Sequence, residues 1–302
     1  MNPSDVRHLA SAIRLTECPR DAMQGIHEFI PTDKKVAYIN SLLKCGFDTI
    51  DFGSFVSPKA IPQMRDTADV LKRLDFSFPS PLGEGLGVRP KLLAIIANIR
   101  GAEEACAFDE ISYLGFPFSI SETFQQRNTN SSIAESLKRV EEIQLLCEKK
   151  NKQMVIYISM AFGNPYGDKW NSDIVIDWVK KISQLGIKVF ALSDTVGVSD
   201  PQSITYLFSN LIPSFPHLEI GAHLHTTPDT WEEKIESAYK AGCKRFDSAL
   251  KGYGGCPMAT DKLTGNMPTE NLVSYFNKKE ISTGVHPNAF FDAMKMAQVT
   301  FP

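Results

Sequence analysis

The chain has 302 residues, of which 43% are hydrophobic and 22% are charged, and its formal net charge at pH 7 is −3. This composition is typical of a globular protein with a large core, and the length fits either one α/β barrel or two medium-sized domains. Lysine and arginine are scattered among acidic residues, which excludes a basic stripe that would bind the backbone of a nucleic acid.

Short runs of β-branched and apolar residues alternate along the chain with segments of helical period, and eight of these runs are predicted to be strands. In chain order they cover residues 13–17, 49–53, 92–97, 110–116, 154–160, 189–194, 219–225 and 245–250. Eight successive strand–helix units indicate an α/β fold of the (β/α)8 TIM-barrel type, formed by a single catalytic domain over residues 1–302. The alternative is an open doubly wound sheet, but no G-x-G-x-x-G motif follows the first strand.

The helical segments carry their own start and stop signals. We expect Thr32 to cap the helix over residues 33–46, and Ser132 and Glu135 have the spacing of a capping box. Several helices end in glycine shortly before the next strand, which is typical of a left-handed C-cap that leads into a parallel sheet. The Pro/Gly-rich segment 78–91 interrupts this pattern, and we expect it to be an exposed insertion without a functional role.

A barrel predicts where its chemistry lies, because the active sites of this fold form at the carboxyl ends of the strands. Polar residues gather at these ends in the sequence. They are Arg20 and Asp21 after the first strand, Asp51 and Ser54 at the second, Asp194 at the sixth, His223 and His225 at the seventh, and Cys256 and Asn266 after the eighth. We therefore expect these side chains to meet at one mouth of the barrel.

The strongest local signal is the His-Leu-His motif at 223–225. Side chains at positions i and i+2 of a strand point to the same side, so both imidazoles are predicted to face the barrel axis while Leu224 packs outward. With the Asp21 carboxylate and the Asn266 amide oxygen they would form a mixed nitrogen and oxygen ligand set. Such a set suits Mg²⁺ or Mn²⁺ better than a closed zinc site. The alternative is that the two histidines are hydrogen-bonded core residues.

Five segments carry a resemblance to a known family. They read PRDAMQ at 19–24, SFVSPKAIPQM at 54–64, LSDTVGV at 192–198, HLH at 223–225 and GYGGCPMATDKLTGN at 252–266. From about Ile13 to Met296 the chain resembles the 3-hydroxy-3-methylglutaryl-CoA lyases, which belong to a group of metal-dependent barrel lyases and Claisen-type condensing enzymes. The second and last segments distinguish this branch from the condensing synthases, which share the barrel and the metal ligands.

The resemblance implies that the chain cleaves an acyl-CoA, 3-hydroxy-3-methylglutaryl-CoA, into acetoacetate and acetyl-CoA with Mg²⁺ or Mn²⁺ as cofactor. It implies that Arg20 faces the thioester oxygen, where negative charge develops during cleavage. Gln24 and Ser54 are expected to contact the substrate beside Arg20. The positions that match the metal ligands of the family are Asp21, His223, His225 and Asn266.

The resemblance also implies catalytic roles beyond the metal ligands. Cys256 matches the reactive cysteine of the family, which takes part in proton transfer on a glycine-rich loop. Asp51 stands where the family has a catalytic glutamate, and Asp194 matches an aspartate that orients the site. Taken alone, each acid would be interpreted as part of a salt bridge, and Cys256 as a buried thiol in a tight turn. The full set of expected catalytic residues is Arg20, Asp21, Asp51, Asp194, His223 and Cys256.

Four places depart from the family pattern, the first being NPY at 164–166, where Cys-Pro-Tyr is usual. Ala22 replaces the glycine after PRD, Asp51 is one methylene shorter than the usual glutamate, and Thr226 follows the histidines where an aspartate is common. If Ala22 requires a positive φ, the change shifts Arg20 and Asp21. These departures leave three alternatives open: a related 3-hydroxyacyl-CoA as substrate, condensation of an acyl-CoA with a 2-keto acid, and a barrel without catalytic activity.

Six cysteines are spread along the chain without a CxxC pair, which predicts neither a disulfide framework nor a zinc knuckle. No segment approaches 18 consecutive apolar residues, and the first residues lack the pattern of a secretory signal. We therefore expect a cytoplasmic protein that binds neither nucleic acid nor a membrane. The family suggests a role in leucine breakdown, and the sequence leaves open whether the chain forms a homodimer.

Overall fold

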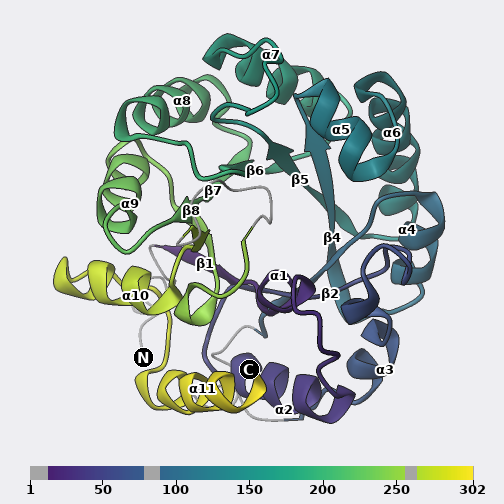
Figure 1. Cartoon of the computed structure of the whole chain (residues 1–302), viewed down its shortest axis with the longest axis vertical. Helices are drawn as coiled ribbons and strands as arrows, with labels where there is room; N and C mark the ends of the chain where they lie inside the picture. The colour runs from purple at the N-terminus through teal and green to yellow at the C-terminus, as the bar shows by residue number, and fades with distance from the viewer. Residues whose placement is uncertain (1–12, 78–88, 256–263, 302) are drawn as a thin grey trace, which may run out of the picture.

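The computed structural model of the chain describes residues 13–77, 89–255 and 264–301. Within them, parallel strands close into a barrel in the order β1-β2-β3-β4-β5-β6-β7-β9, with helices arranged around it (Figure 1). The strands are β1 (Arg14–Glu17), β2 (Thr49–Ser54), β3 (Lys91–Ile95), β4 (Ile111–Ser119), β5 (Gln153–Ser159), β6 (Val189–Ser193), β7 (Glu219–His223) and β9 (Arg245–Ser248). The (β/α)8 barrel predicted from the sequence is confirmed.

The described helices connect successive strands or complete the carboxyl end of the chain. They are α1 (Pro19–Gln24), α2 (Thr32–Leu43), α3 (Thr67–Lys72), α4 (Ile99–Cys106), α5 (Glu122–Thr129), α6 (Ile133–Lys149), α7 (Ser172–Ser183), α8 (Pro201–Ser214), α9 (Trp231–Lys240), α10 (Thr269–Lys278) and α11 (Pro287–Thr300). Two short 3₁₀ helices, η2 (Pro62–Met64) and η3 (Leu250–Gly252), lie in loops. In the described part of the chain, no helix is both long enough and apolar enough to span a bilayer.

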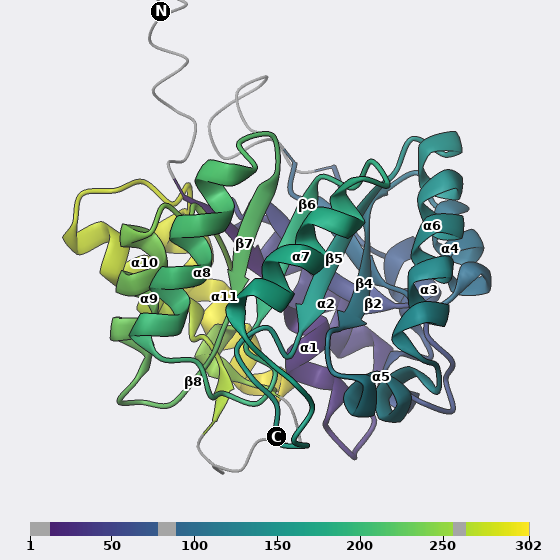
Figure 2. The same cartoon turned by 90° about the horizontal axis from the view of Figure 1, so that it is seen from above.

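The barrel closes where the first strand meets the last. β1 pairs with β9 in parallel from Arg14↔Arg245 to Glu17↔Ser248, and on its other side β1 pairs with β2. Because all eight strands run the same way, their carboxyl ends form one mouth. Figure 2 shows α1, α5 and the short strand β8 (His225–Thr226) at this same end of the barrel.

Most of the helix signals in the sequence are confirmed. Ser132 and Glu135 form the predicted capping box at the start of α6, and Gly46, Gly186 and Gly242 adopt left-handed φ values of 85°, 88° and 100°. The Thr32 cap was wrong. The helix begins at Thr32 itself, with Pro31 as the N-cap. The Thr32 hydroxyl has the Asp66 carboxylate as its partner instead, and it donates to this carboxylate at 2.8 Å.

The predicted insertion over 78–91 falls largely outside the described residues, which resume at residue 89. Its last residue does not belong to an insertion. Lys91 opens β3, and its ammonium group donates to the Tyr113 hydroxyl on β4 at 2.9 Å. The strand therefore starts one residue earlier than the apolar run that predicted it, because a long cationic side chain can reach a partner on the neighbouring strand.

The interior of the barrel is divided into an apolar half and a charged half. The apolar half comes from β3 to β6 and contains Leu93, Ile95, Tyr113, Val155, Tyr157, Val189 and Ala191. The charged half comes from β1, β2, β7 and β9, where Asp51, Arg245 and Asp247 are buried. Ions in a barrel interior are stable only when they are paired, so this half must contain an organised network of charges.

Glu17 is the last residue of β1, and it binds the segments on either side of the glycine-rich loop. It is fully buried and accepts hydrogen bonds from the Leu250 amide at 2.8 Å and from the Thr269 hydroxyl at 2.6 Å. Burial raises the pKa of Glu17 to about 8, against the hydrogen bonds that favour its ionised form. The folded state therefore holds a proton on Glu17 that the unfolded chain releases at neutral pH.

This proton predicts a pH dependence of stability. The pKa of Glu17 rises from 4.5 to about 8 on folding, so its contribution to the free energy of unfolding falls as the pH rises between these values. Glu17→Gln keeps a neutral hydrogen-bonding group and removes this dependence. We expect the variant to gain stability relative to the unsubstituted protein on going from pH 5.5 to pH 8, measured by urea unfolding. Glu141→Gln on exposed α6 is the matched control. A pH-independent difference for Glu17→Gln would contradict the prediction.

Candidate active site

Helix α1 places three polar side chains at the mouth of the barrel. It follows β1 after a single residue and lies inside the ring of outer helices (Figure 1). Ala22 is part of this helix, is buried, and is absent from the non-glycine residues of positive φ in the described chain. The helical backbone therefore accommodates alanine, and the departure from the family pattern at Ala22 does not displace Arg20 or Asp21.

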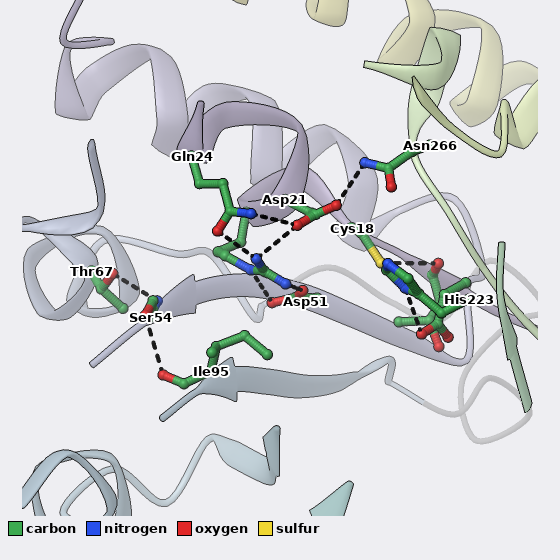
Figure 3. A network of polar contacts seen from close by, with 12 residues as sticks. Cys18, Asp21, Gln24, Asp51, Ser54, Thr67, Ile95, His223 and Asn266 are labelled. Carbon is green, nitrogen blue, oxygen red and sulfur yellow. Dashed lines mark hydrogen bonds and ion pairs between the residues drawn. The ribbon is translucent and has the colours of Figure 1, made fainter. Parts of the chain in front are cut away.

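Arg20 links the first two strands through a buried network. Its Nε donates to both oxygens of Asp51 at 3.2 and 3.0 Å, and its Nη2 donates to Asp51 Oδ2 at 2.5 Å. Its Nη1 donates to Asp21 Oδ1 at 2.8 Å and to Gln24 Oε1 at 2.7 Å. The Gln24 amide in turn donates to Asp21 Oδ1 at 2.8 Å. Figure 3 shows Asp21, Gln24 and Asp51 converging on one point.

This network sets the charge of each member. Burial alone would lower the pKa of Arg20, but its attraction to Asp51 and Asp21 outweighs burial and raises the pKa. Burial raises the pKa of Asp51 to about 6, against the opposing effect of Arg20. Burial also acts to raise the pKa of Asp21, but Arg20 and the two histidines outweigh it and lower the pKa. The site therefore holds a permanent cation, a carboxylate that can exchange a proton near neutral pH, and a carboxylate that stays ionised.

Asp21, His223 and His225 form a group that could hold a metal ion. Their ligand atoms lie within 4.8 Å of one another. The prediction that the two histidines share one strand was wrong. β7 ends at His223, and His225 begins β8, which pairs antiparallel with β10 (Gly265–Asn266). The chain turns away from the barrel after Leu224, and the β8–β10 pair then places Asn266 directly beside His225.

Two observations test whether these residues fit a cation. His225 Nδ1 donates to the Thr195 carbonyl at 3.2 Å, and burial together with His223 lowers the pKa of His225 to about 4. The neutral ring then carries its lone pair on Nε2, which is buried and has no hydrogen-bond partner. The Asn266 amide donates to Asp21 Oδ2 and to the Tyr253 carbonyl, each at 2.8 Å, so its oxygen is left as an acceptor. The residues fit a divalent cation bound by nitrogen and oxygen.

Asp194 is linked to this group through Lys234. Its carboxylate accepts from the Ser199 amide at 3.0 Å and hydroxyl at 2.5 Å, and from the Lys234 ammonium at 2.8 Å. The same ammonium group donates to the backbone oxygen of His225 at 2.9 Å. Asp194 therefore acts on the site through Lys234, which holds the His225 backbone. The sequence analysis missed Lys234, which is buried although it lies on amphipathic α9.

Ser54 is not brought into the Arg20 network. Its hydroxyl donates to the Ile95 carbonyl at 3.3 Å and accepts from the Val56 amide at 3.2 Å, while its own amide donates to Thr67. Figure 3 shows Ser54, Thr67 and Ile95 as a group separate from Asp21. These bonds fix the carboxyl ends of β2 and β3. A contact between Ser54 and substrate stays a prediction, and Cys256 lies outside the described residues.

Asp247 is a further site residue that the sequence analysis missed. It lies on β9 directly beside His223 in the strand register, and its Oδ2 accepts a hydrogen bond from His223 Nδ1 at 3.3 Å. Burial alone would lower the pKa of His223, but the bond and the attraction to Asp247 outweigh burial and raise it. The signal in the sequence is a single acidic residue inside the strand segment RFDS, and such a residue alone does not indicate a role in the site.

The chain is similar to known proteins over nearly its whole length. The family model described as HMGL-like matches residues 13–297. A hydroxymethylglutaryl-CoA lyase of Bacillus subtilis is 32% identical over 289 residues, covering 92% of this chain and 89% of the relative. Among solved structures, the HMG-CoA lyase from Brucella melitensis has a TM-score of 0.86 at 26% identity, over 96% of this chain and 99% of its own.

A second solved structure carries ligands. It is an HMG-CoA lyase from Acinetobacter baumannii in complex with coenzyme A and 3-methylmalate, with a TM-score of 0.84 at 30% identity. The alignment covers 95% of this chain and 90% of that one. The family model matches residues 13–297, and the B. subtilis relative aligns over 92% of this chain. This chain therefore belongs to the HMGL-like family.

Proposed function

We propose that the chain is a carbon–carbon lyase that cleaves 3-hydroxy-3-methylglutaryl-CoA into acetoacetate and acetyl-CoA with Mg²⁺ or Mn²⁺ bound at Asp21, His223, His225 and Asn266. One observation carries the proposal: the Arg20 guanidinium is hydrogen-bonded to Asp21, one of the three residues grouped as a cation site. The B. subtilis lyase supports the reaction, and the A. baumannii structure with coenzyme A supports an acyl-CoA substrate.

The reaction breaks one carbon–carbon bond and moves one proton at each end. The tertiary hydroxyl of the substrate loses its proton, and the bond between C2 and C3 breaks. The oxygen then becomes the ketone of acetoacetate, while the bonding electrons pass to the thioester as the enolate of acetyl-CoA. A proton added to the enolate carbon completes acetyl-CoA. A bound divalent cation would supply a Lewis acid for the substrate hydroxyl and carboxylate.

Arg20 is placed to stabilise the enolate. A guanidinium has five N–H groups, and the contacts with Asp51, Asp21 and Gln24 leave one N–H on Nη2 for an acceptor. We assign that N–H to the thioester oxygen. The cation persists through the reaction because a guanidinium does not lose its proton in a protein. Its carboxylate partners also hold it in position before the substrate binds, so little reorganisation is needed during cleavage.

Asp51 is the proposed acceptor of a proton in this cycle. Its pKa of about 6 leaves it mainly ionised at neutral pH yet basic enough to take up a proton. Cys256, which matches the reactive cysteine of the family, is the proposed donor to the enolate. Asp194 and Gln24 position the site, since Gln24 contacts both Arg20 and Asp21 and Asp194 binds Lys234.

The alternatives to a lyase, and the expected location, pathway and oligomeric state, are considered in turn. The helical conformation of Ala22 removes one argument for a non-catalytic barrel. Condensation with a 2-keto acid is an outcome that the first assay below distinguishes, and a related 3-hydroxyacyl-CoA substrate stays an alternative. A cytoplasmic location, a role in leucine breakdown and a homodimer remain predictions.

The proposal predicts equal amounts of acetoacetate and acetyl-CoA from 3-hydroxy-3-methylglutaryl-CoA, measured by enzyme-coupled assay. Because the cation would stabilise the substrate alkoxide, we expect EDTA to abolish the activity and Mn²⁺ or Mg²⁺ to restore it. Free CoA released from acetyl-CoA and a 2-keto acid would identify a condensing enzyme instead. A folded, Mn²⁺-loaded protein that releases no acetoacetate would refute the lyase assignment.

The ligand set predicts which substitutions remove the cation. We expect Asp21→Ala and His225→Ala each to abolish the Mn²⁺ binding seen with the unsubstituted protein by isothermal titration calorimetry. His217→Ala is the matched control, because this imidazole is exposed on the loop before β7. Folding of each variant is checked by circular dichroism. Unchanged Mn²⁺ binding in His225→Ala would show that the cation lies elsewhere.

The raised pKa of Asp51 predicts an acid limit to activity. The carboxyl must be ionised to accept a proton, so we expect kcat/KM to fall as the pH drops through about 6. Asp51→Asn cannot accept the proton and should lose about 10²- to 10⁴-fold in kcat. The measurement is a pH profile from 5 to 8 with circular dichroism at each pH. A flat profile with intact structure would exclude Asp51 as the proton acceptor.

A further inference from the structure

A chain of charged groups, buried at its centre, leads from the cation site through the barrel. It starts at His223 and passes through Asp247 and Arg245 on β9 to Glu219 on β7 and Arg14 on β1. The successive contacts are 3.3 Å, 3.3 Å, 3.4 Å and 2.6 Å. Asp247 and Arg245 are each only 2% exposed. Asp247 and Arg245 are costly to bury, and neither has a role in the chemistry described above.

The first contact decides which ring nitrogen of His223 is available. Asp247 Oδ2 lies 3.3 Å from Nδ1, and a carboxylate there accepts the Nδ1–H of the ring. Within residues 13–77, 89–255 and 264–301, Nε2 makes no hydrogen bond. The tautomer with a proton on Nδ1 therefore presents its lone pair on Nε2. Ring orientation and tautomer of a metal-binding histidine are commonly fixed by such a carboxylate.

Arg245 holds Asp247 in place from the other side. Its Nη2 lies 3.3 Å from Asp247 Oδ1 and donates to the Thr16 hydroxyl at 3.2 Å. The fold leaves room for this side chain at Gly221, where a Cβ would lie 3.0 Å from Cγ and Nη1 of Arg245. The guanidinium compensates a carboxylate that would otherwise be a buried, uncompensated charge beside the cation site.

The surroundings also exclude a second cation at Asp247. Cys18, His223 and Asp247 have ligand atoms within 4.8 Å of one another. Arg245 already places a positive charge against Asp247. The Cys18 thiol donates to the Thr16 carbonyl at 3.7 Å, so it carries its proton in this structure. A protonated thiol beside an ion-paired carboxylate is a poor cation site.

We propose that Asp247 is a positioning residue that orients the metal ligand His223, with Arg245 as its counter-ion. The inference rests on the proposed function, because it assumes that His223 binds the cation. Asp247 then supports the reaction through the geometry and basicity of one ligand and does not touch the substrate.

The test measures Mn²⁺ affinity without substrate, by isothermal titration calorimetry and by electron paramagnetic resonance. We expect Asp247→Ala to weaken Mn²⁺ binding by about 10- to 100-fold. Asp247→Asn keeps an acceptor for Nδ1–H and should recover most of the loss. Asp177→Ala is the matched control, because it removes an exposed carboxylate on α7 that takes no part in these contacts, and it should bind Mn²⁺ like the unsubstituted protein.

A double variant guards against misfolding. Asp247→Leu combined with Arg245→Met replaces the ion pair by apolar groups of similar size, a change that buried pairs often tolerate. We expect it to fold and to show the same loss of Mn²⁺ affinity as Asp247→Ala. A folded Asp247→Ala or double variant that binds Mn²⁺ as tightly as the unsubstituted protein would overturn the proposal. Two Mn²⁺ ions per chain, with one lost in Asp247→Ala, would also overturn it, because Asp247 would then be a ligand.

A second readout does not depend on metal or activity. Nitrogen-15 NMR of the metal-free protein reports the tautomer of His223, which we expect to carry its proton on Nδ1 and to lose this preference in Asp247→Ala. A proton on Nε2 in the unsubstituted protein would refute the inference. If the unsubstituted protein binds no Mn²⁺, the metal-dependent function fails as well, whereas equal binding by unsubstituted and substituted proteins removes only the role of Asp247.

Discussion

The active site depends on one buried cation, the Arg20 guanidinium, held between Asp51 on β2 and Asp21 on α1. A buried cation is stable only when carboxylates meet it, and breaking a buried pair by removing one partner costs about 3–5 kcal/mol. The network therefore fixes α1 across the mouth of the barrel. Arg20 serves the reaction and the fold with the same contacts, since the carboxylates that neutralise it also aim its remaining N–H.

The division of the barrel interior explains how such a site can exist inside a well-packed core. The apolar residues of β3 to β6 fill one half with well-packed side chains. The opposite half is reserved for charges, which are linked in pairs from Arg14 at one end to His223 at the other. The cation site lies at the carboxyl ends of these strands, where carboxylates, imidazoles and guanidinium groups compensate one another.

Three distant segments supply the proposed metal ligands, and two structural features hold Asp21, His225 and Asn266 in place. Asp21 is held by α1 and the Arg20 network, whereas His225 and Asn266 are held by the β8–β10 pair. Thr226 takes part in that pair opposite Gly265, so the residue where an aspartate is common in the family here has a structural role. Two of the departures from the family pattern, Ala22 and Thr226, thus lie in the regular backbone of α1 and β8.

The sequence by itself determined the number and order of the barrel strands, the α6 capping box, and the end of the barrel at which polar residues gather. These features follow from hydrophobic period and local hydrogen bonding, which act over a few residues. Only the tertiary structure decided that β7 stops at His223, that Asn266 reaches His225 through β8 and β10, and that Asp247 and Lys234 support the histidines. Those contacts join residues far apart in the chain, and their energies depend on burial and partners that appear only when the barrel closes.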